Sequence, residues 1–165
     1  KEDLQKYPRT PERDIELAEK FGVTHLWLPR YEEIYPAGFA TLAAGPIGNL
    51  YEGASRPGHF DGVVTVVRRL FDLVRPKVAI FGEKDFQQLT LIREIAAEVE
   101  IIAAPTIRES ILATESALTI DYADYIDEQT FLPPTDSTRF TRAIVAGWIN
   151  GVRLLDNMQM KSEAQ

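Results

Sequence analysis

A short stretch in the middle of the chain carries more polar groups than its place in a fold requires. The segment VAIFGEKDFQQLTLIREI (residues 78–95) starts as a buried-strand pattern and turns into a helix pattern. Gly82 relaxes the turn, Asp85 is a good helix cap, and Gln88 three residues later would complete an approximate capping box. Neither the capping box nor the turn explains Lys84 or the glutamine pair.

The same turn has the chemistry of an anion site. Backbone N–H groups and the dipole at a helix N-terminus favour negative charge. Lys84 would add a mobile positive charge against a phosphate, and Gln88 offers one acceptor and two donors to a small polar ligand. From the residues alone, the turn-and-cap explanation and the ligand-binding explanation both stay open.

A second polar segment, YEGASRPGHF, precedes a long helix pattern. It is either a glycine-rich loop or a cleft wall lined by Glu52, Arg56 and His59, and the guanidinium suits a carboxylate or phosphate. The only other histidine, His25, lies in a short apolar segment, which favours a hydrogen-bonded structural role. No close cluster of His, Asp and Glu has metal-ligand spacing, so we expect no protein metal site.

Composition limits the function further. The chain has 165 residues, 45% of them hydrophobic, a net charge of −7 and no cysteine. A core is expected, whereas disulfides, thiolate chemistry, nucleic-acid binding and anionic membranes are disfavoured. No apolar run has membrane-spanning length, and no signal segment is recognisable, so we expect a soluble, cytoplasmic protein.

Element signals follow one another closely before residue 105. A first helix is punctuated by Thr10 as N-cap and Gly22 as C-cap. The remaining predictions are a strand over 24–29, a helical turn over 30–36, a helix over 60–75, a strand over 77–81, a helix over 85–97 and a strand over 99–104. Helices alternating with strands imply a parallel sheet, whose ligands bind at the carboxyl ends of the strands.

The pattern changes after Glu109. Residues 117–127 alternate like a half-buried strand, and residues 140–160 read as two strands joined at Asn150-Gly151. We therefore expect an α/β protein with two domains. Residues 1–109 would form a Rossmann-like nucleotide-binding domain and residues 110–165 a small α+β domain.

Taken together, several segments resemble pantothenate synthetase, the pantoate–β-alanine ligase family. The segments are DLQKYPRT, YEEIYP, YEGASRPGHFDGV, AIFGEKDFQQLTLIR, PTIRE and, late in the chain, RLLDN. The resemblance implies a reaction in which pantoate and ATP form pantoyl adenylate and pyrophosphate. The amine of β-alanine then displaces AMP to give pantothenate.

The resemblance also implies site residues. An ATP site would include Gly82, Glu83, Lys84, Asp85 and Ile107, with Lys84 as the catalytic cation that neutralises the phosphates. Gln88 would bind pantoate, and Mg²⁺ would accompany the nucleotide. A homodimer is the assembly that the family resemblance suggests.

Three family features are missing from this sequence. The H-x-G-H motif needs two histidines three apart, but the chain's two are His25 and His59. The first-strand segment with a second pantoate glutamine is absent, and PTIRES runs directly into ILATES without the SSRN loop. The Rossmann-like domain is therefore incomplete. Either segments of a full enzyme are left out, or the chain is a truncated, inactive module that binds nucleotide or dimerises. Loss of the first strand should expose a large apolar edge of the sheet.

Overall fold

The computed structural model describes residues 9–104, 119–149 and 151–160. The chain divides into two compact units, Lys1–Ala37 and Gly38–Gln165. Each unit is described by itself. The domain boundary predicted after Glu109 falls outside the described residues and remains a prediction.

The first unit contains helix α2 (Pro11–Lys20) and the single turn α3 (Tyr31–Ile34), as the sequence predicts. Gly22 has a φ of 73° and ends α2 in the left-handed region, where glycine has no steric penalty. Thr10 occupies the N-cap position, but its hydroxyl contacts the Asp14 carboxylate at 3.4 Å and not the backbone. The N-cap prediction is therefore right in position and wrong in its hydrogen bond.

The strand predicted over residues 24–29 is wrong. This segment has no regular secondary structure, and Leu26, Trp27 and Leu28 are about half exposed or more. A strand needs a hydrogen-bonded neighbour, and none occurs among the described residues of this unit (9–37). His25 is exposed and its Nδ1 lies 3.0 Å from the Thr24 hydroxyl, a local contact only.

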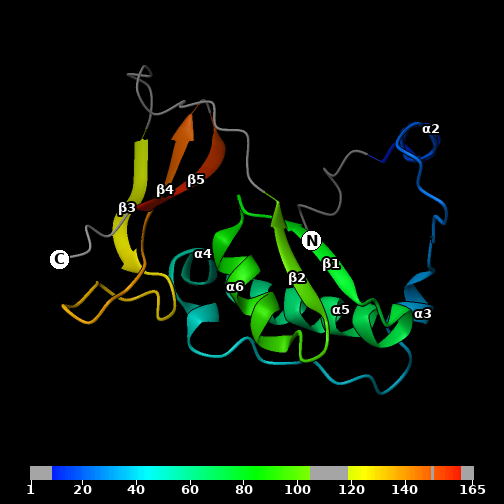
Figure 1. Cartoon of the computed structure of the whole chain (residues 1–165), viewed down its shortest axis with the longest axis horizontal. Coiled ribbons are helices and arrows are strands. Elements are labelled where there is room, and N and C mark those ends of the chain that lie inside the picture. Colours follow the sequence, from blue (N-terminus) through cyan, green and yellow to red (C-terminus); the bar gives the residue numbers. More distant parts are fainter. Residues whose placement is uncertain (1–8, 105–118, 150, 161–165) are drawn as a thin grey trace. The chain divides into compact units, whose positions relative to one another are not determined.

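The second unit begins with the 3₁₀ turn η1 (Ile47–Asn49) and α4 (Tyr51–Ser55), followed by α5 (His59–Val74). Strand β1 (Val78–Gly82), helix α6 (Phe86–Ile95) and strand β2 (Glu100–Ala104) complete the alternation that the sequence predicts. The two strands are parallel, with Ile80 opposite Ile102 (Figure 1).

One face of the β1–β2 sheet packs and the other does not. Phe81 meets Phe71 of α5 edge-on, with the ring centroids 6.4 Å apart. On the opposite face Ile80 is 69% exposed, and Val78 and Ile102 are also exposed. Apolar side chains are therefore exposed on one face of this parallel sheet.

The C-terminal part is a three-stranded antiparallel sheet in the order β3 (Thr119–Asp127), β4 (Thr141–Ile149), β5 (Val152–Met160). All three strands were predicted, and Gly151 at φ 78° lies in the connection between β4 and β5 (Figure 1). No helix accompanies them among residues 119–149 and 151–160. The α/β class is thus confirmed, and the helical component expected of an α+β appendage is not found in this part.

A single apolar cluster joins α6 to the antiparallel sheet. It contains Phe86 and Leu89 of α6, Ile126 of β3, Ile144 of β4, and Phe131 from the connection between β3 and β4. The Phe86 and Phe131 rings stack with centroids 5.6 Å apart. The start of α6 is therefore fixed by side chains that lie far later in the chain.

Candidate active site

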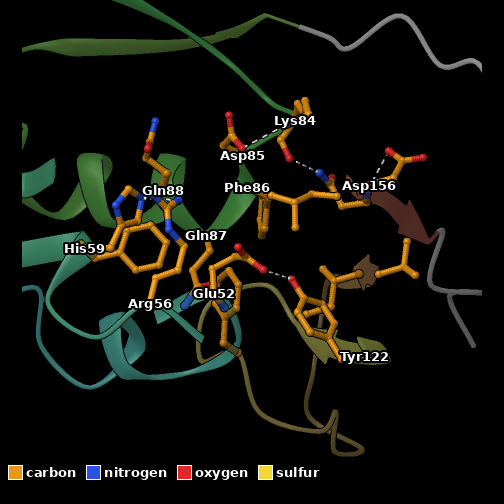
Figure 2. Close-up of a pocket in the computed structure, with 16 residues that line it drawn as sticks. Glu52, Arg56, His59, Lys84, Asp85, Phe86, Gln87, Gln88, Tyr122 and Asp156 are labelled. Carbon is orange, nitrogen blue, oxygen red and sulfur yellow. Dashed lines mark hydrogen bonds and ion pairs between the residues drawn. The ribbon is translucent and has the colours of Figure 1, made fainter. Parts of the chain in front are cut away.

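The two polar segments of the sequence meet in one pocket. It lies at the carboxyl end of β1, where α6 begins, opposite the turn between α4 and α5 (Figure 2). Six residues singled out from the sequence line it: Glu52, Arg56, His59, Lys84, Asp85 and Gln88. This is the edge at which ligands bind in parallel α/β sheets.

The pocket is small. Its cavity measures about 60 Å³, whereas sites that enclose drug-sized ligands measure roughly 300–1,000 Å³. The described residues can therefore surround a small polar group but not a whole nucleotide. They form one part of a larger site if a nucleotide binds here.

Lys84 and Asp85 lie where the strand ends and the helix begins. Lys84 Nζ approaches Asp85 Oδ1 at 3.5 Å, and both side chains are about half exposed. The Asp85 side chain makes no capping hydrogen bond, so the predicted capping box is wrong. Because Asp85 leaves the first turn of α6 uncapped, the N–H groups there keep their capacity to bind an anion.

The two neighbouring glutamines have different roles. Gln87 is buried, and its Nε2 donates to the carbonyl oxygens of Ile47 at 2.7 Å and Leu50 at 2.8 Å. Its Oε1 accepts from the Glu52 backbone N–H at 3.2 Å. Gln87 is thus a structural link to η1 and α4, whereas Gln88 is part of the pocket lining.

Arg56 and His59 occupy the opposite wall. An Arg56 guanidinium nitrogen lies 3.2 Å from His59 Nε2. A guanidinium can only donate, so Nε2 is the acceptor in this contact. The pocket lining carries the cations Arg56 and Lys84 together with the carboxylates Glu52, Asp85 and Asp156.

Glu52 is the anchor of that wall and not an open ligand. Its carboxylate accepts from the Tyr122 hydroxyl at 3.1 Å (Figure 2). It also accepts from Arg153 at 2.6 Å. Burial, and then the Glu52 carboxylate, raise the pKa of Tyr122 above its ordinary value. Hydrogen bonding to Glu52 and Asp121 raises the pKa of Arg153. Tyr122 stays neutral and Arg153 charged in this cluster.

Glu83 is tied to the antiparallel sheet and does not line the pocket. Its carboxylate accepts from Arg142 at 2.9 Å, and the same guanidinium donates to Glu128 at 2.9 Å. Arg142 also lies 3.7 Å above the Phe86 ring. Gly82 does not line the pocket either, and Ile107 lies outside the described residues.

Four functional candidates were missed as individual residues: Tyr122, Arg142, Arg153 and Asn157. They come from the antiparallel sheet and reach Glu52 or Glu83 across 59 to 101 residues of chain. Arg153 and Asn157 fall within RLLDN, a segment that resembled the family, so a signal existed for these two. Nothing in the local pattern distinguished Tyr122 or Arg142.

Two negative findings apply to the described residues. No group of three or more His, Cys, Asp or Glu side chains could hold a metal ion among them. Within the same part of the chain, none of the helices has the length and apolar character needed to cross a membrane.

Comparison with known proteins identifies the class. Residues 1–116 match the family described as Pantoate-beta-alanine ligase. The Pantothenate synthetase of Chlorobium chlorochromatii is 37% identical over 216 residues, covering 96% of this chain and 74% of that protein. The chain belongs to the pantoate–β-alanine ligase family.

Solved structures agree with this assignment. The crystal structure of pantothenate synthetase from Thermus thermophilus has a TM-score of 0.84 at 34% identity, covering 97% of this chain and 78% of that one. Pantoate-beta-alanine ligase from Francisella tularensis, complexed with beta-gamma ATP and β-alanine, has a TM-score of 0.76 at 26% identity, covering 96% of this chain and 73% of that one. The fold is that of the family.

The alignment with the Chlorobium protein is longer than this chain. About 158 residues, 96% of the 165, spread over 216 positions, so about 58 aligned positions have no residue in this chain. The Pantothenate synthetase of Nocardioides sp. is 52% identical over 114 residues, covering 66% of this chain and 34% of that protein.

Proposed function

We propose that the pocket at the end of β1 is the ATP- and pantoate-binding part of a pantoate–β-alanine ligase. The observation that carries the proposal is the convergence of GEKDFQQ and EGASRPGHF on one cavity, with two cations, Lys84 and Arg56, on its lining. Both are suited to phosphate or carboxylate oxygens. The family membership of the chain supplies the reaction.

In the first step, a carboxylate oxygen of pantoate attacks the α-phosphorus of ATP and the bond to pyrophosphate breaks. In the second, the amine of β-alanine attacks the acyl carbon of pantoyl adenylate and AMP leaves with the bonding electrons. Lys84 would neutralise charge that builds on the phosphates as pyrophosphate departs. Gln88 would hold pantoate through its amide.

The remaining ATP contacts are assigned on family grounds. Asp85 or Gly82 would meet the ribose, and the backbone at Ile107 would meet the adenine end of ATP. Glu83 would act indirectly, through its ion pair with Arg142. Mg²⁺ would accompany the nucleotide and be held by the phosphates of ATP.

The assembly and location follow the same reasoning. A homodimer in the cytoplasm is proposed because the chain belongs to a family of biosynthetic enzymes. Its substrates are small molecules, and its charge of −7 disfavours nucleic acid and anionic membranes as partners.

AMP release tests the proposal. The chain is incubated with ATP, Mg²⁺, pantoate and β-alanine, and AMP formation is measured. In the control reactions pantoate or β-alanine is omitted. We expect AMP formation to require both pantoate and β-alanine. At saturating ATP, Lys84→Ala should lower its rate at least about tenfold. AMP formation that ignores pantoate would contradict the assigned substrate.

A second candidate is a chain that binds nucleotide without ligase turnover. It is favoured by one observation: neither His25 nor His59 has a second histidine three residues away, as the H-x-G-H motif requires. ATP binding in calorimetry, combined with no AMP release above background, would select this candidate. AMP release above background would exclude it.

A further inference from the structure

We propose that Asn157 is a positioning residue that fixes the Lys84 turn for ATP. The inference rests on the proposed function of the pocket. Asn157 lies on the last strand, β5, and its side chain reaches the turn between β1 and α6. Its side-chain Nδ2 donates to the carbonyl oxygens of Glu83 at 3.1 Å and Lys84 at 2.9 Å. One amide therefore holds two consecutive peptide groups of the turn.

Arg142 fixes Asn157 in turn. The guanidinium of Arg142, on the neighbouring strand β4, donates to Asn157 Oδ1, which orients the amide with its N–H groups toward the turn. Arg142 is 2% exposed and is also paired with Glu83 and Glu128. A buried guanidinium with three partners has few alternative positions, so it is a rigid support.

The turn is held on both sides of Lys84. Before it, the Glu83 carboxylate is paired with Arg142. After it, the Phe86 ring contacts the Arg142 guanidinium, 3.7 Å from its centroid, and the stacked ring of Phe131. The backbone from Glu83 to Phe86 is thus attached to the antiparallel sheet at each end and, through Asn157, in the middle.

This attachment matters because the Lys84 side chain is only weakly held at its tip. It is 52% exposed, and its ammonium contact within the described residues is a 3.5 Å ion pair with the half-exposed Asp85. A flexible four-carbon stem can reach a phosphate reproducibly only if its backbone is fixed. Asn157 supplies that restraint without touching the cation.

Two variants separate positioning from charge. Asn157→Asp keeps an oxygen for Arg142 but removes the N–H donors, and Asn157→Leu removes them without adding charge. Val64→Ala, a cavity-forming change in α5 at a position that is 1% exposed and outside the Phe86 cluster, is the matched control for overall stability. Hydrogen exchange of the segment 82–88 and ATP affinity, by calorimetry with ATP and Mg²⁺, are measured on all four proteins below their unfolding transitions.

We expect both Asn157 variants to exchange the segment 82–88 about threefold faster or more, and to bind ATP about fivefold more weakly or worse. Val64→Ala should change neither the exchange of this segment nor the ATP affinity. Unchanged exchange, or faster exchange with unchanged ATP affinity, would overturn the positioning role. Weaker binding in Asn157→Asp alone would assign the effect to charge repulsion and also overturn it.

The outcome distinguishes this inference from the proposed function. If the unmodified chain binds no ATP, the proposed function fails, and the positioning role fails with it. If the unmodified chain binds ATP and the Asn157 variants bind equally well, the proposed function stands and only the positioning role is rejected.

Discussion

Glu52 and Arg153 are joined by a 2.6 Å hydrogen bond across 101 residues of chain. The pair connects α4, which contains the first residues of EGASRPGHF, to the last strand of the antiparallel sheet. Both side chains are largely buried, at 10% and 16% exposure. The ion pair between Arg142 and Glu83 makes a second connection of this kind. Through these two pairs the antiparallel sheet holds the segments around the pocket.

Removing the Glu52 carboxylate should destabilise the protein strongly. In Glu52→Leu the Arg153 guanidinium keeps Asp121 but loses its buried partner, and the Tyr122 hydroxyl loses its acceptor. Loss of one member of a buried ion pair typically costs about 3 kcal/mol or more. Urea unfolding measures the change in free energy.

The matched control for Glu52→Leu is the exposed pair Arg68–Asp72 on α5, whose side chains are both 44% exposed. Asp72→Ala should cost less than about 1 kcal/mol because water screens the pair. Equal losses in Glu52→Leu and Asp72→Ala would show that the Glu52 cluster adds nothing beyond a surface ion pair.

Tyr122 predicts a loss of stability at high pH. Burial and the Glu52 carboxylate raise its pKa in the folded state, so the folded protein retains a proton that the unfolded chain releases above about pH 10. The contribution of Tyr122 is complete below pH 10 and declines as the pH rises toward the folded-state pKa. Its slope approaches about 1.4 kcal/mol per pH unit.

Tyr122→Phe should be less stable than the unmodified chain at pH 7 but lose stability less steeply above pH 10. Guanidinium unfolding at half-unit pH steps from about 8 to 11.5, a range that spans the ordinary tyrosine pKa, measures both slopes. Tyr35 and Tyr51 also have raised pKa values, so a residual slope remains in the variant. Identical slopes in the two proteins would contradict the burial argument.

Substitution of the two neighbouring glutamines should affect different properties, stability for Gln87 and substrate binding for Gln88. Gln87→Ala removes the three hydrogen bonds of a buried side chain and takes its acceptor from the Glu52 backbone N–H, so we expect it to lower the free energy of unfolding by about 2 kcal/mol. Gln88→Ala should leave stability within about 0.5 kcal/mol and raise the KM for pantoate about tenfold, with the KM for ATP little changed.

Steady-state kinetics and thermal melts on the two glutamine variants make the comparison. A Gln88→Ala effect of equal size on both substrates would count against its assignment to pantoate.

Gly53 should not accept any side chain. A Cβ built there would lie 1.8 Å from the Gly48 carbonyl oxygen, which is backbone and cannot move aside without displacing η1. We expect Gly53→Ala to destabilise the protein by more than about 3 kcal/mol, or to prevent folding. Gly62, in the first half of α5, meets nothing within 4 Å. Gly62→Ala should instead stabilise by up to about 1 kcal/mol. If the melting temperatures of Gly53→Ala and Gly62→Ala shift in the same direction, the close contact between residue 53 and the Gly48 carbonyl oxygen is refuted.

Local signals predicted the elements well. The helix at α5, the alternation β1–α6–β2 and the three C-terminal strands all follow from periodicity and turn residues, and the structure confirms them. The predicted strand around Trp27 failed because an apolar run does not say whether a partner strand exists. The Asp85 capping box failed because the side chain contacts Lys84 instead.

The site was predicted only in part. Motif position brought Lys84, Gln88, Arg56 and His59 to one pocket, since strand ends and the following helix starts share an edge. The sequence could not reveal that Glu83 and Glu52 are tied to Arg142 and Arg153. Such pairs depend on how the antiparallel sheet docks, which no local pattern encodes.

In the proposed function, the turn between β1 and α6 receives the phosphates of ATP. The most direct measurement is an amide ¹H–¹⁵N titration of the 18.6 kDa chain with ATP and Mg²⁺. We predict saturable chemical-shift changes of the Gly82–Gln88 amides. Lys84→Ala should weaken the ATP affinity measured from these changes at least about fivefold. Saturable shifts elsewhere with none in this segment, or equal affinity in Lys84→Ala, would contradict the claim.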